Sequence, residues 1–330
     1  MKIKPLLLLF AFLALCSCNS SKNENTVYRP VIISDWWNVA GNPDLGAYTS
    51  PKQEPVDFGV WQAADGTWQL WSCIRKTNCG GHTRLFHGWE AQNLTDSLWK
   101  PLGIVMEADT TLGEKQGGLQ APHVIKKDGM YYMLYGGWAQ ICLAKSSDGK
   151  HFERVINKKG TSEIFSGPFI NTRDPMTIKI DDTYYCYYTG HLMDFKPGEI
   201  RAAIFCRTSQ NLFDWSEPTM VSGGGSIAEM DSWGGGDAEC PFVVRVDNKY
   251  VLFRNVEYGK NNINFQYCSD NPLNYGVNTD SLMVGNLPVA APEIVYFNNE
   301  YYIFALKETL DGIRAAKIKF EKTGNNEFHK

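Results

Sequence analysis

A fivefold internal repeat constrains the fold of this chain more than any other feature of its sequence. In four copies a proline is followed nine residues later by a tyrosine, and these copies begin at Pro122, Pro175, Pro241 and Pro292. A fifth copy, which lacks the proline, begins at Asp57. The copies start near residues 57, 122, 174, 239 and 292, at intervals of 52 to 65 residues. Self-similarity at such a period is typical of repeat architectures, in which each copy is one supersecondary unit.

Each copy has the pattern of a β-hairpin. A run rich in branched residues leads to a polar pair, after which the apolar pattern resumes; the polar pairs are Asp128-Gly129, Asp181-Asp182, Asp247-Asn248 and Asn298-Asn299. Such a pair between apolar segments indicates a strand, a tight turn and a second strand. A further strand-like segment follows the hairpin, as in residues 141–148 and 203–209.

Three or four strands in each of five units predict an all-β fold, a five-bladed β-propeller that forms a single domain over residues 27–330. Residues 27–33 precede the first copy, and we expect them to supply the outer strand that closes the ring. Long helices are not expected, because no segment of the sequence shows a sustained period of 3.6 residues. An array of β-sandwiches is the alternative, and the regular spacing of the copies argues against it.

The N-terminus has the pattern of an export signal. Lys2 and Lys4 precede a short apolar run over residues 6–15, and the following Leu-Cys-Ser-Cys resembles a bacterial lipoprotein box with Cys18 as the lipidated residue. We therefore expect a lipoprotein signal peptide over residues 1–17 and a flexible tether over residues 18–26. The mature protein would be an exported bacterial lipoprotein, in the periplasm or on the outer-membrane surface. The alternative is an ordinary cleaved signal peptide on a secreted protein.

The composition limits the class of partner. The formal net charge is −4 and the sequence has no basic stripe, which argues against nucleic acid as a partner. Aromatic residues make up 13% of the chain, and their side chains suit both half-buried strands and the binding of sugar rings. Seven cysteines follow Cys18, an odd and scattered set that favours reduced thiols. A bridge between Cys73 and Cys79 is the alternative.

Acidic residues stand at the start of three predicted inner strands. They are Asp57, Asp174 and Glu239, and we expect them at matched positions of three blades. Because all inner strands of a propeller start at the same end of its axis, these side chains should surround one cavity. Hydrolysis of a glycosidic bond needs one carboxyl group to protonate the leaving oxygen and a second to attack the anomeric carbon or activate water. The alternative is that these acids only cap turns and stay solvated.

Other polar and aromatic residues adjoin these acids or follow the return strands, so we expect them at the same end of the axis. The candidates for substrate binding are Arg75, His123, Trp138, Arg173, His191 and Arg254. Such groups can hydrogen-bond sugar hydroxyls, and Trp138 can stack on a sugar ring. The histidines and cysteines lack the close spacing of zinc ligands, so neither a metal site nor a cofactor is expected.

Two of the acids lie in motifs that resemble those of known enzymes. Thr172-Arg173-Asp174-Pro175 and Ala238-Glu239-Cys240-Pro241 resemble the Arg-Asp-Pro and Glu-Cys motifs of glycoside hydrolase families 32 and 68. The arrangement of three acids over residues 50–310 also resembles family 43 and the related five-bladed families 62, 117 and 130.

This resemblance implies a role for each acid. Asp57 would be the nucleophile, as in family 32, or the general base, as in family 43. Asp174 would stabilise the transition state and tune the pKa of its neighbours, Glu239 would be the general acid, and Arg173 would orient Asp174 or bind substrate. The first copy has Val56-Asp57-Phe58-Gly59 in place of the Asn-Asp-Pro-Asn-Gly of family 32, which argues against fructose specificity and leaves retention or inversion open.

We therefore expect an exo-acting glycosidase that trims plant or algal oligosaccharides or polysaccharides and reaches a membrane through its lipid anchor. A glycoside phosphorylase of the same fold is one alternative. The other is a non-catalytic glycan-binding surface lipoprotein, because a fold alone does not establish activity.

Overall fold

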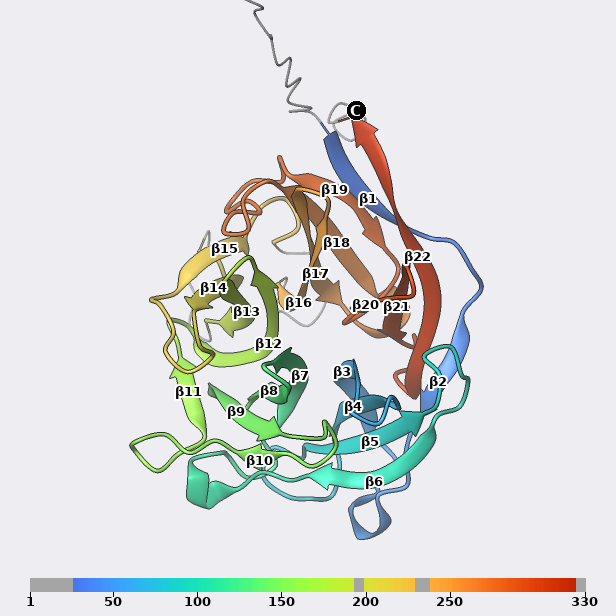
Figure 1. Cartoon of the computed structure of the whole chain (residues 1–330), viewed down its shortest axis with the longest axis vertical. Helices are drawn as coiled ribbons and strands as arrows, with labels where there is room; N and C mark the ends of the chain where they lie inside the picture. The colour runs from blue at the N-terminus through green and yellow to red at the C-terminus, as the bar shows by residue number, and fades with distance from the viewer. Residues whose placement is uncertain (1–25, 193–198, 229–237, 325–330) are drawn as a thin grey trace, which may run out of the picture.

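Five antiparallel sheets are arranged around one central axis (Figure 1). The computed structural model describes residues 26–192, 199–228 and 238–324. These residues confirm the predicted all-β fold and the five-bladed β-propeller. The predicted signal peptide, Cys18 and all of the tether except Thr26 lie outside the described residues, so the lipid anchor stays a prediction.

The blades follow one another along the chain, each with its innermost strand first. Blade 1 consists of β3 (Glu54–Gln62), β4 (Trp68–Arg75), β5 (Leu85–Ala91) and β6 (Lys100–Met106). Blade 2 consists of β7 (Gln120–Lys127), β8 (Met130–Gly136), β9 (Gln140–Ser146), β10 (Glu153–Arg154) and β11 (Glu163–Ser166). Blade 3 consists of β12 (Ile170–Ile180), β13 (Thr183–His191), β14 (Ala202–Ser209) and β15 (Thr219–Gly223).

The last two blades complete the ring. Blade 4 consists of β16 (Glu239–Val246), β17 (Lys249–Glu257), β18 (Ile263–Ser269) and β19 (Met283–Leu287). Blade 5 consists of β20 (Glu293–Phe297), β21 (Glu300–Leu306), β22 (Gly312–Gly324), β1 (Thr26–Ile32) and β2 (Trp37–Gly41). The helices of the described residues are single 3₁₀ turns, namely η1 (Gly46–Tyr48), η2 (Thr110–Leu112) and η3 (Gly259–Asn261). None of the helices there is long and apolar enough to cross a membrane.

The predicted polar pairs form the turns of the inner hairpins. Lys127 pairs with Met130 across Asp128-Gly129, and the pairs at 181–182, 247–248 and 298–299 have the equivalent register. The first residue of each of these turns has a φ between 50° and 53°. Aspartate and asparagine tolerate this left-handed conformation better than most residues, so their presence fixes the two-residue turns and the strand register.

Blade 5 joins the two ends of the chain. β1 pairs antiparallel with β22 along all seven of its residues, which confirms the predicted closing strand. Tyr28 of β1 also reaches blade 4, where its hydroxyl donates to Asp247 and its amide donates to Cys268 Sγ at 3.4 Å. The first described strand therefore holds blades 4 and 5 together as well as closing the ring.

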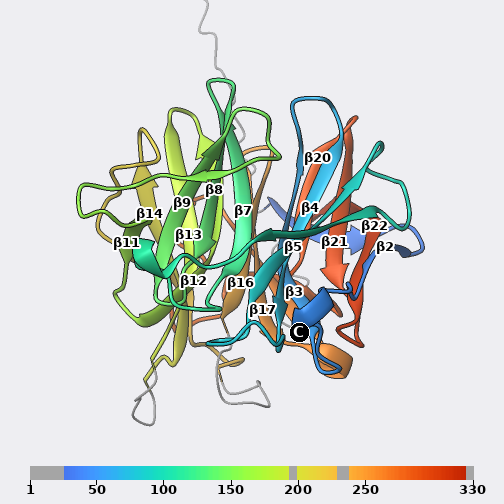
Figure 2. The ribbon, with the colours of Figure 1, turned by 90° about the horizontal axis from the view of Figure 1, so that it is seen from below.

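Aromatic packing and close backbone contact hold neighbouring blades together near the axis. Trp61 and Trp71 of blade 1 pack edge-to-face against Phe152 of blade 2, with ring centroids 5.9 and 5.3 Å away. A side chain at Gly59 would place its Cβ 2.3 Å from the carbonyl oxygen of Pro122 in the next blade. Figure 2 shows the strands running lengthwise between the two faces of the propeller. The side chains at one end of the inner strands therefore gather at one face.

All seven cysteines in the described part of the chain are free thiols, as we expected from their odd number and scattered positions. Five of them are buried, whereas Cys79 and Cys240 are half-buried. The expected reduced set is therefore confirmed, but Cys240 has a position that the sequence analysis did not assign.

The contribution of the closing strand β1 to the stability of the propeller can be tested through Tyr28. Tyr28 is 6% exposed, so Tyr28→Ala should reduce the free energy of unfolding by about 3–5 kcal/mol, through the lost burial and the cavity left behind. Tyr28→Phe should cost about 1 kcal/mol, because it removes only the hydrogen bond to Asp247. Urea unfolding measures both values. The control is Tyr296→Ala in the same blade, where the side chain is 58% exposed and the cost should be about 1 kcal/mol or less; equal losses at the two tyrosines would contradict the role of β1.

Candidate active site

The residues at the start of each inner strand share an unusual backbone conformation. Their φ values are 34° at Asp57, 41° at Ala121, 55° at Asp174, 42° at Cys240 and 45° at Ala291. We call these five residues the axial ring. In blades 1 to 4 the strand register shifts at this point, as it does at a β-bulge. A bulge redirects a side chain out of the regular alternation of a strand, so the ring side chains are directed to the axis.

The axial ring corrects the expected alignment of the three acids. Asp57 and Asp174 belong to the ring, but the equivalent residue of blade 4 is Cys240. Glu239 lies one residue earlier and pairs with the second strand of its blade, as Arg173 does in blade 3. The three acids thus occupy two kinds of position, and the matched-position prediction is wrong by one residue for Glu239. The axial-ring residue of blades 2 to 5 directly precedes the repeat proline, so alignment on Pro241 assigns Cys240 and not Glu239 to the ring.

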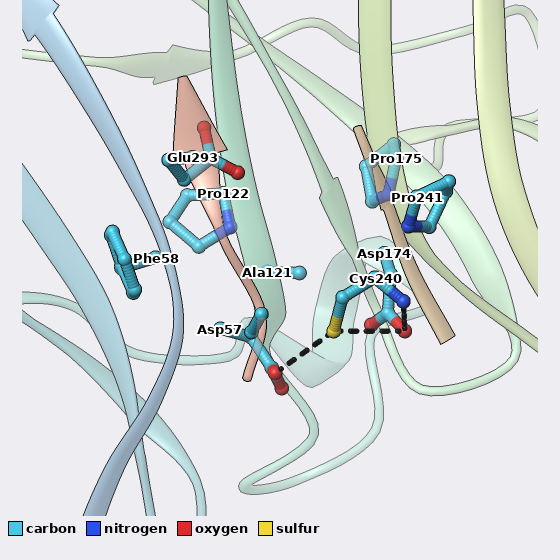
Figure 3. A pocket seen from close by; sticks show the side chains of 10 residues that line it. Asp57, Phe58, Ala121, Pro122, Asp174, Pro175, Cys240, Pro241 and Glu293 are labelled. Carbon is cyan, nitrogen blue, oxygen red and sulfur yellow. Dashed lines mark hydrogen bonds between the residues drawn. The ribbon is translucent and has the colours of Figure 1, made fainter. Parts of the chain in front are cut away.

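Cys240 lies between the two aspartates. Its Sγ is 3.2 Å from Asp57 Oδ1 and 3.7 Å from Asp174 Oδ2, and its backbone N–H donates to Asp174 Oδ2 at 3.3 Å (Figure 3). Both aspartates are buried, with 8% and 3% of their surfaces exposed. The thiol also lies 3.1 Å from the hydroxyl of Tyr258. Groups from blades 1, 3 and 4 therefore meet at one point of the axis.

Arg173 joins Glu239 to this cluster. Because Arg173 and Glu239 occupy equivalent positions of neighbouring blades, the guanidinium lies against the carboxylate and donates to its Oε1. Arg173 Nε is also 3.5 Å from Asp174 Oδ2, and His191 Nε2 is 3.2 Å from Glu239 Oε1. All four side chains are buried. Asp174 and Glu239 thus share the guanidinium of Arg173 within a buried site, where charges interact more strongly than in water.

Burial dominates the proton equilibria of the site. Burial raises the pKa of Asp174 from 3.8 to about 7, in spite of Arg173, and the charge of Asp57 adds to the rise. Burial also raises the pKa of Glu239, against the opposing effect of Arg173. The pKa of His191 is lowered to about 2 by burial and by the charge of Arg173, so its imidazole is neutral at ordinary pH. A carboxyl group that keeps its proton near neutral pH is suited to act as an acid.

A small cavity continues along the axis from the aspartates. Its volume is about 20 Å³, enough for one water molecule or ion. Besides the axial ring, its lining residues are Phe58, Pro122, Pro175, Pro241 and Glu293. Figure 3 shows Glu293 and Pro122 at one end of the cavity and Asp57 and Cys240 at the other. A sugar ring is too large for this space, so a substrate would approach from the end where the inner strands start.

His123 lies deeper than the three acids. Its Nε2 is 3.0 Å from the carbonyl oxygen of Thr177, and its Nδ1 is 4.0 Å from Glu293. Burial lowers the pKa of His123 to about 4, so its imidazole is neutral at pH 7, and burial raises the pKa of Glu293 well above its usual value. This position on the far side of the cavity gives no support to the predicted contact of His123 with substrate.

Trp138 follows the return strand β8 in a constrained conformation. Its φ is 89°, and the side chain of Asn171 donates to its carbonyl oxygen at 2.9 Å while accepting from Arg173. One face of its indole stacks on His82, with ring centroids 3.6 Å apart and an interplanar angle of 13°. The predicted platform therefore has one face already covered by protein, and its position depends on the same arginine that binds Glu239.

The other two predicted arginines have protein partners. Arg75 Nε is 2.7 Å from Glu54 Oε2 at the start of blade 1. Arg254 is 1% exposed and donates to Ser222 Oγ at 3.3 Å and to the carbonyl oxygen of Gly224 at 3.1 Å, between blades 3 and 4. Contact of either residue with substrate stays a prediction, and the burial of Arg254 gives it a packing role.

Three residues of the site were missed by the sequence analysis. Cys240 contacts Asp57, Tyr258 contacts Cys240 and Glu239, and Asn171 contacts Arg173. The signal for Cys240 was present, because it directly precedes Pro241 as Asp174 precedes Pro175. Tyr258 follows the return strand β17, and Asn171 precedes Arg173 by two residues, where no periodic pattern distinguishes them.

Comparison with known proteins identifies solved structures that share the fold of this chain. No protein-family model and no curated protein matches the chain. Among solved structures, a thermostable family-43 glycoside hydrolase is 17% identical with a TM-score of 0.58, over 83% of this chain and 92% of that one. A family-43 β-xylosidase/α-arabinofuranosidase from a compost microbial metagenome, solved with xylotriose, is 18% identical with a TM-score of 0.56, over 86% and 99%.

A third structure belongs to another family with the same fold. The catalytic domain of a family-62 α-L-arabinofuranosidase from Coprinopsis cinerea is 13% identical with a TM-score of 0.56, over 87% of this chain and 98% of that one. The chain therefore shares the five-bladed β-propeller of family-43 and family-62 glycoside hydrolases.

The raised pKa of Asp174 predicts how stability depends on pH. The folded protein holds this proton more tightly than the unfolded chain, so the contribution of Asp174 to stability should fall as pH rises from about 4 to about 7. Asp174→Asn removes this ionisation. Relative to the native protein, it should gain up to about 4 kcal/mol of unfolding free energy across that interval. Urea unfolding at a series of pH values measures the difference, and parallel pH profiles would show that Asp174 titrates normally.

Proposed function

We propose that this protein is a glycosidase that removes a terminal sugar from xylose- or arabinose-containing oligosaccharides. The observation that carries the proposal is the convergence of Asp57, Asp174 and Glu239, from three blades, at one end of the axis. The fold shared with family-43 and family-62 enzymes, one of them solved with xylotriose, supports this class of substrate. The predicted lipid anchor at Cys18 would hold the site at a bacterial membrane.

Glu239 has the properties of the general acid. Burial and the charge of Asp57 favour its protonated form, while Arg173 and His191 fix the position of its carboxyl group. In the proposed reaction Glu239 gives its proton to the glycosidic oxygen as the bond to the anomeric carbon breaks. Proton transfer from a positioned acid typically contributes about 10²- to 10⁴-fold in rate.

Asp57 is proposed as the general base, and Asp174 as the group that tunes the pKa values of Asp57 and Glu239. Asp57 takes a proton from a water molecule, whose oxygen bonds to the anomeric carbon on the face opposite the leaving group. Asp174 lies against Cys240 and Arg173, so its charge state alters the electrostatic potential at both Asp57 and Glu239.

Hydrolysis is favoured over phosphorolysis by the partners of the nearby arginines. Arg75, Arg173 and Arg254 are engaged by Glu54, Glu239 and the 222–224 segment respectively. A phosphate ion would have to displace one of these contacts. Turnover that requires added phosphate would overturn this part of the proposal.

Substitution of the acid tests the reaction. Glu239→Gln should lower kcat by about 10³-fold on an unactivated oligosaccharide, because the proton donor is lost. On an aryl glycoside with a strongly acidic leaving group it should lose far less, since that leaving group departs without a proton. Release of xylose or arabinose, with circular dichroism to verify folding, gives both measurements.

The matched control is Glu293→Gln, which alters a second buried carboxyl group of the same cavity at its far end. This variant should keep its turnover within a few-fold of the native rate. If Glu239→Gln retained full activity on oligosaccharides, or if the native protein bound the glycan without releasing product, the proposed function would be wrong.

The role of Asp57 predicts the stereochemistry of the product. Direct attack of water, assisted by Asp57, places the new hydroxyl on the opposite face of the sugar, so the first product should have the inverted anomeric configuration. Proton NMR of a fresh reaction observes the anomer before mutarotation. A retained configuration would instead assign Asp57 as a nucleophile that forms a glycosyl-enzyme.

A further inference from the structure

We propose that Asp57, Asp174 and Cys240 form a binding site for a soft divalent cation such as Zn²⁺ or Cd²⁺. One sulfur and two carboxylate oxygens, each from a different blade, lie within 4.8 Å of one another. They line the same axial cavity, whose volume of about 20 Å³ accommodates a single ion. The proposed reaction uses no metal, although two of these ligands, Asp57 and Asp174, also take part in it.

The spacing of the donors suits tetrahedral coordination. Zinc–sulfur bonds are about 2.3 Å and zinc–carboxylate bonds about 2.0–2.2 Å, so a tetrahedral angle separates sulfur from oxygen by about 3.5 Å. The two sulfur–oxygen distances of Cys240 are 3.2 Å to Asp57 and 3.7 Å to Asp174. Three protein ligands would leave a fourth position for water.

A second observation points to a ligand at the same place. Asp174 is 3% exposed, and its Oδ1 is buried without a hydrogen-bond partner among the described residues. A buried acceptor of this kind costs about 1–3 kcal/mol unless something satisfies it. A cation in the cavity would supply that partner.

The local charge also favours a cation. Two guanidinium groups lie near these carboxyl groups. The closest contact of Arg173 is with Glu239 and not with the aspartates, and Arg75 pairs with Glu54 while it also interacts with the charge of Asp57. His191 is neutral and adds no positive charge. A divalent ion would replace the proton of the Cys240 thiol and any proton held by Asp174. Both protons pass to solvent, and the charge of the ion offsets the negative charge that these ligands then carry.

The thiolate determines which metal ions the site prefers. Sulfur ligands favour Zn²⁺ and related soft ions, whereas Ca²⁺ takes six to eight oxygen ligands, more than this cluster offers. We therefore expect Zn²⁺ and Cd²⁺ to bind and Ca²⁺ not to displace them. Because the ion would occupy Asp57 and Asp174, it would also block turnover; this consequence rests on the proposed function.

Cadmium titration of the full-length chain tests the site. Ultraviolet absorption of the Cd²⁺–thiolate bond and calorimetry measure binding with no need for activity. Cys240→Ser should lose one bound Cd²⁺ per chain, with affinity reduced by more than about 100-fold, because a direct soft ligand is replaced by a hydroxyl. Cys79→Ser alters the other half-buried thiol and should bind as the native protein does. Equal binding by Cys240→Ser and the native protein, or displacement by equimolar Ca²⁺, would overturn the proposal.

A measurement on the native protein covers the case in which Cys240→Ser does not fold. Cd²⁺ should protect Cys240 from alkylation, as detected by mass spectrometry of its peptide, and absence of protection would overturn the site. Failure of the two proposals is distinguishable. If Cd²⁺ binds at Cys240 but the metal-free protein hydrolyses no glycan, only the proposed function fails; if glycan is hydrolysed but Cys240 binds no Cd²⁺, only the metal site fails.

Discussion

The backbone conformation near the start of each inner strand, which forms a bulge in blades 1 to 4, is the constraint on which the site depends. At this point the backbone takes a positive φ in all five blades, a conformation that residues other than glycine adopt at a cost of about 1–3 kcal/mol. The flanking hairpins and the contacts between blades maintain it. In return, one side chain from every blade is directed at the axis. The chemistry of the site is decided by which residues occupy those five positions and the positions just before them.

Occupancy of these positions differs from blade to blade. Blades 2 and 5 place Ala121 and Ala291 in the axial ring, so they contribute no charge and leave room for the cavity. Blades 1, 3 and 4 place Asp57, Asp174 and Cys240 there. The preceding position carries the opposite charges Arg173 and Glu239 in neighbouring blades, which brings them into contact. A symmetric scaffold therefore produces an asymmetric site through the identity of a few side chains.

The sequence predicted the fold closely because its signals are local. The turn pairs, the spacing of the prolines and the alternation of apolar residues each depend on nearby residues, and together they defined five hairpins and the closing strand. The three acids were identified for the same reason. The one-residue offset of Glu239 was missed although Pro241 marks it, whereas the burial of Arg254 against residues 222–224 depends on a contact between blades that no local pattern reveals. The contact of His123 with Glu293 could not be read from local patterns either, because the two residues are 170 positions apart in the chain.

The presence of a thiol between two carboxylates follows from the electrostatics of the cluster. A neutral S–H can donate one hydrogen bond to an aspartate without bringing a positive charge to the axis. A lysine or arginine at position 240 would stabilise both carboxylates and lower the pKa of Asp174, whereas an alanine would leave more buried oxygens without partners. The thiol supplies one of the hydrogen bonds that the buried carboxylate oxygens require, and it leaves the pKa of Asp174 near 7. The same sulfur, once it loses its proton, becomes a ligand. A residue that suits the metal-free cluster by being neutral is therefore the one through which a soft cation would bind.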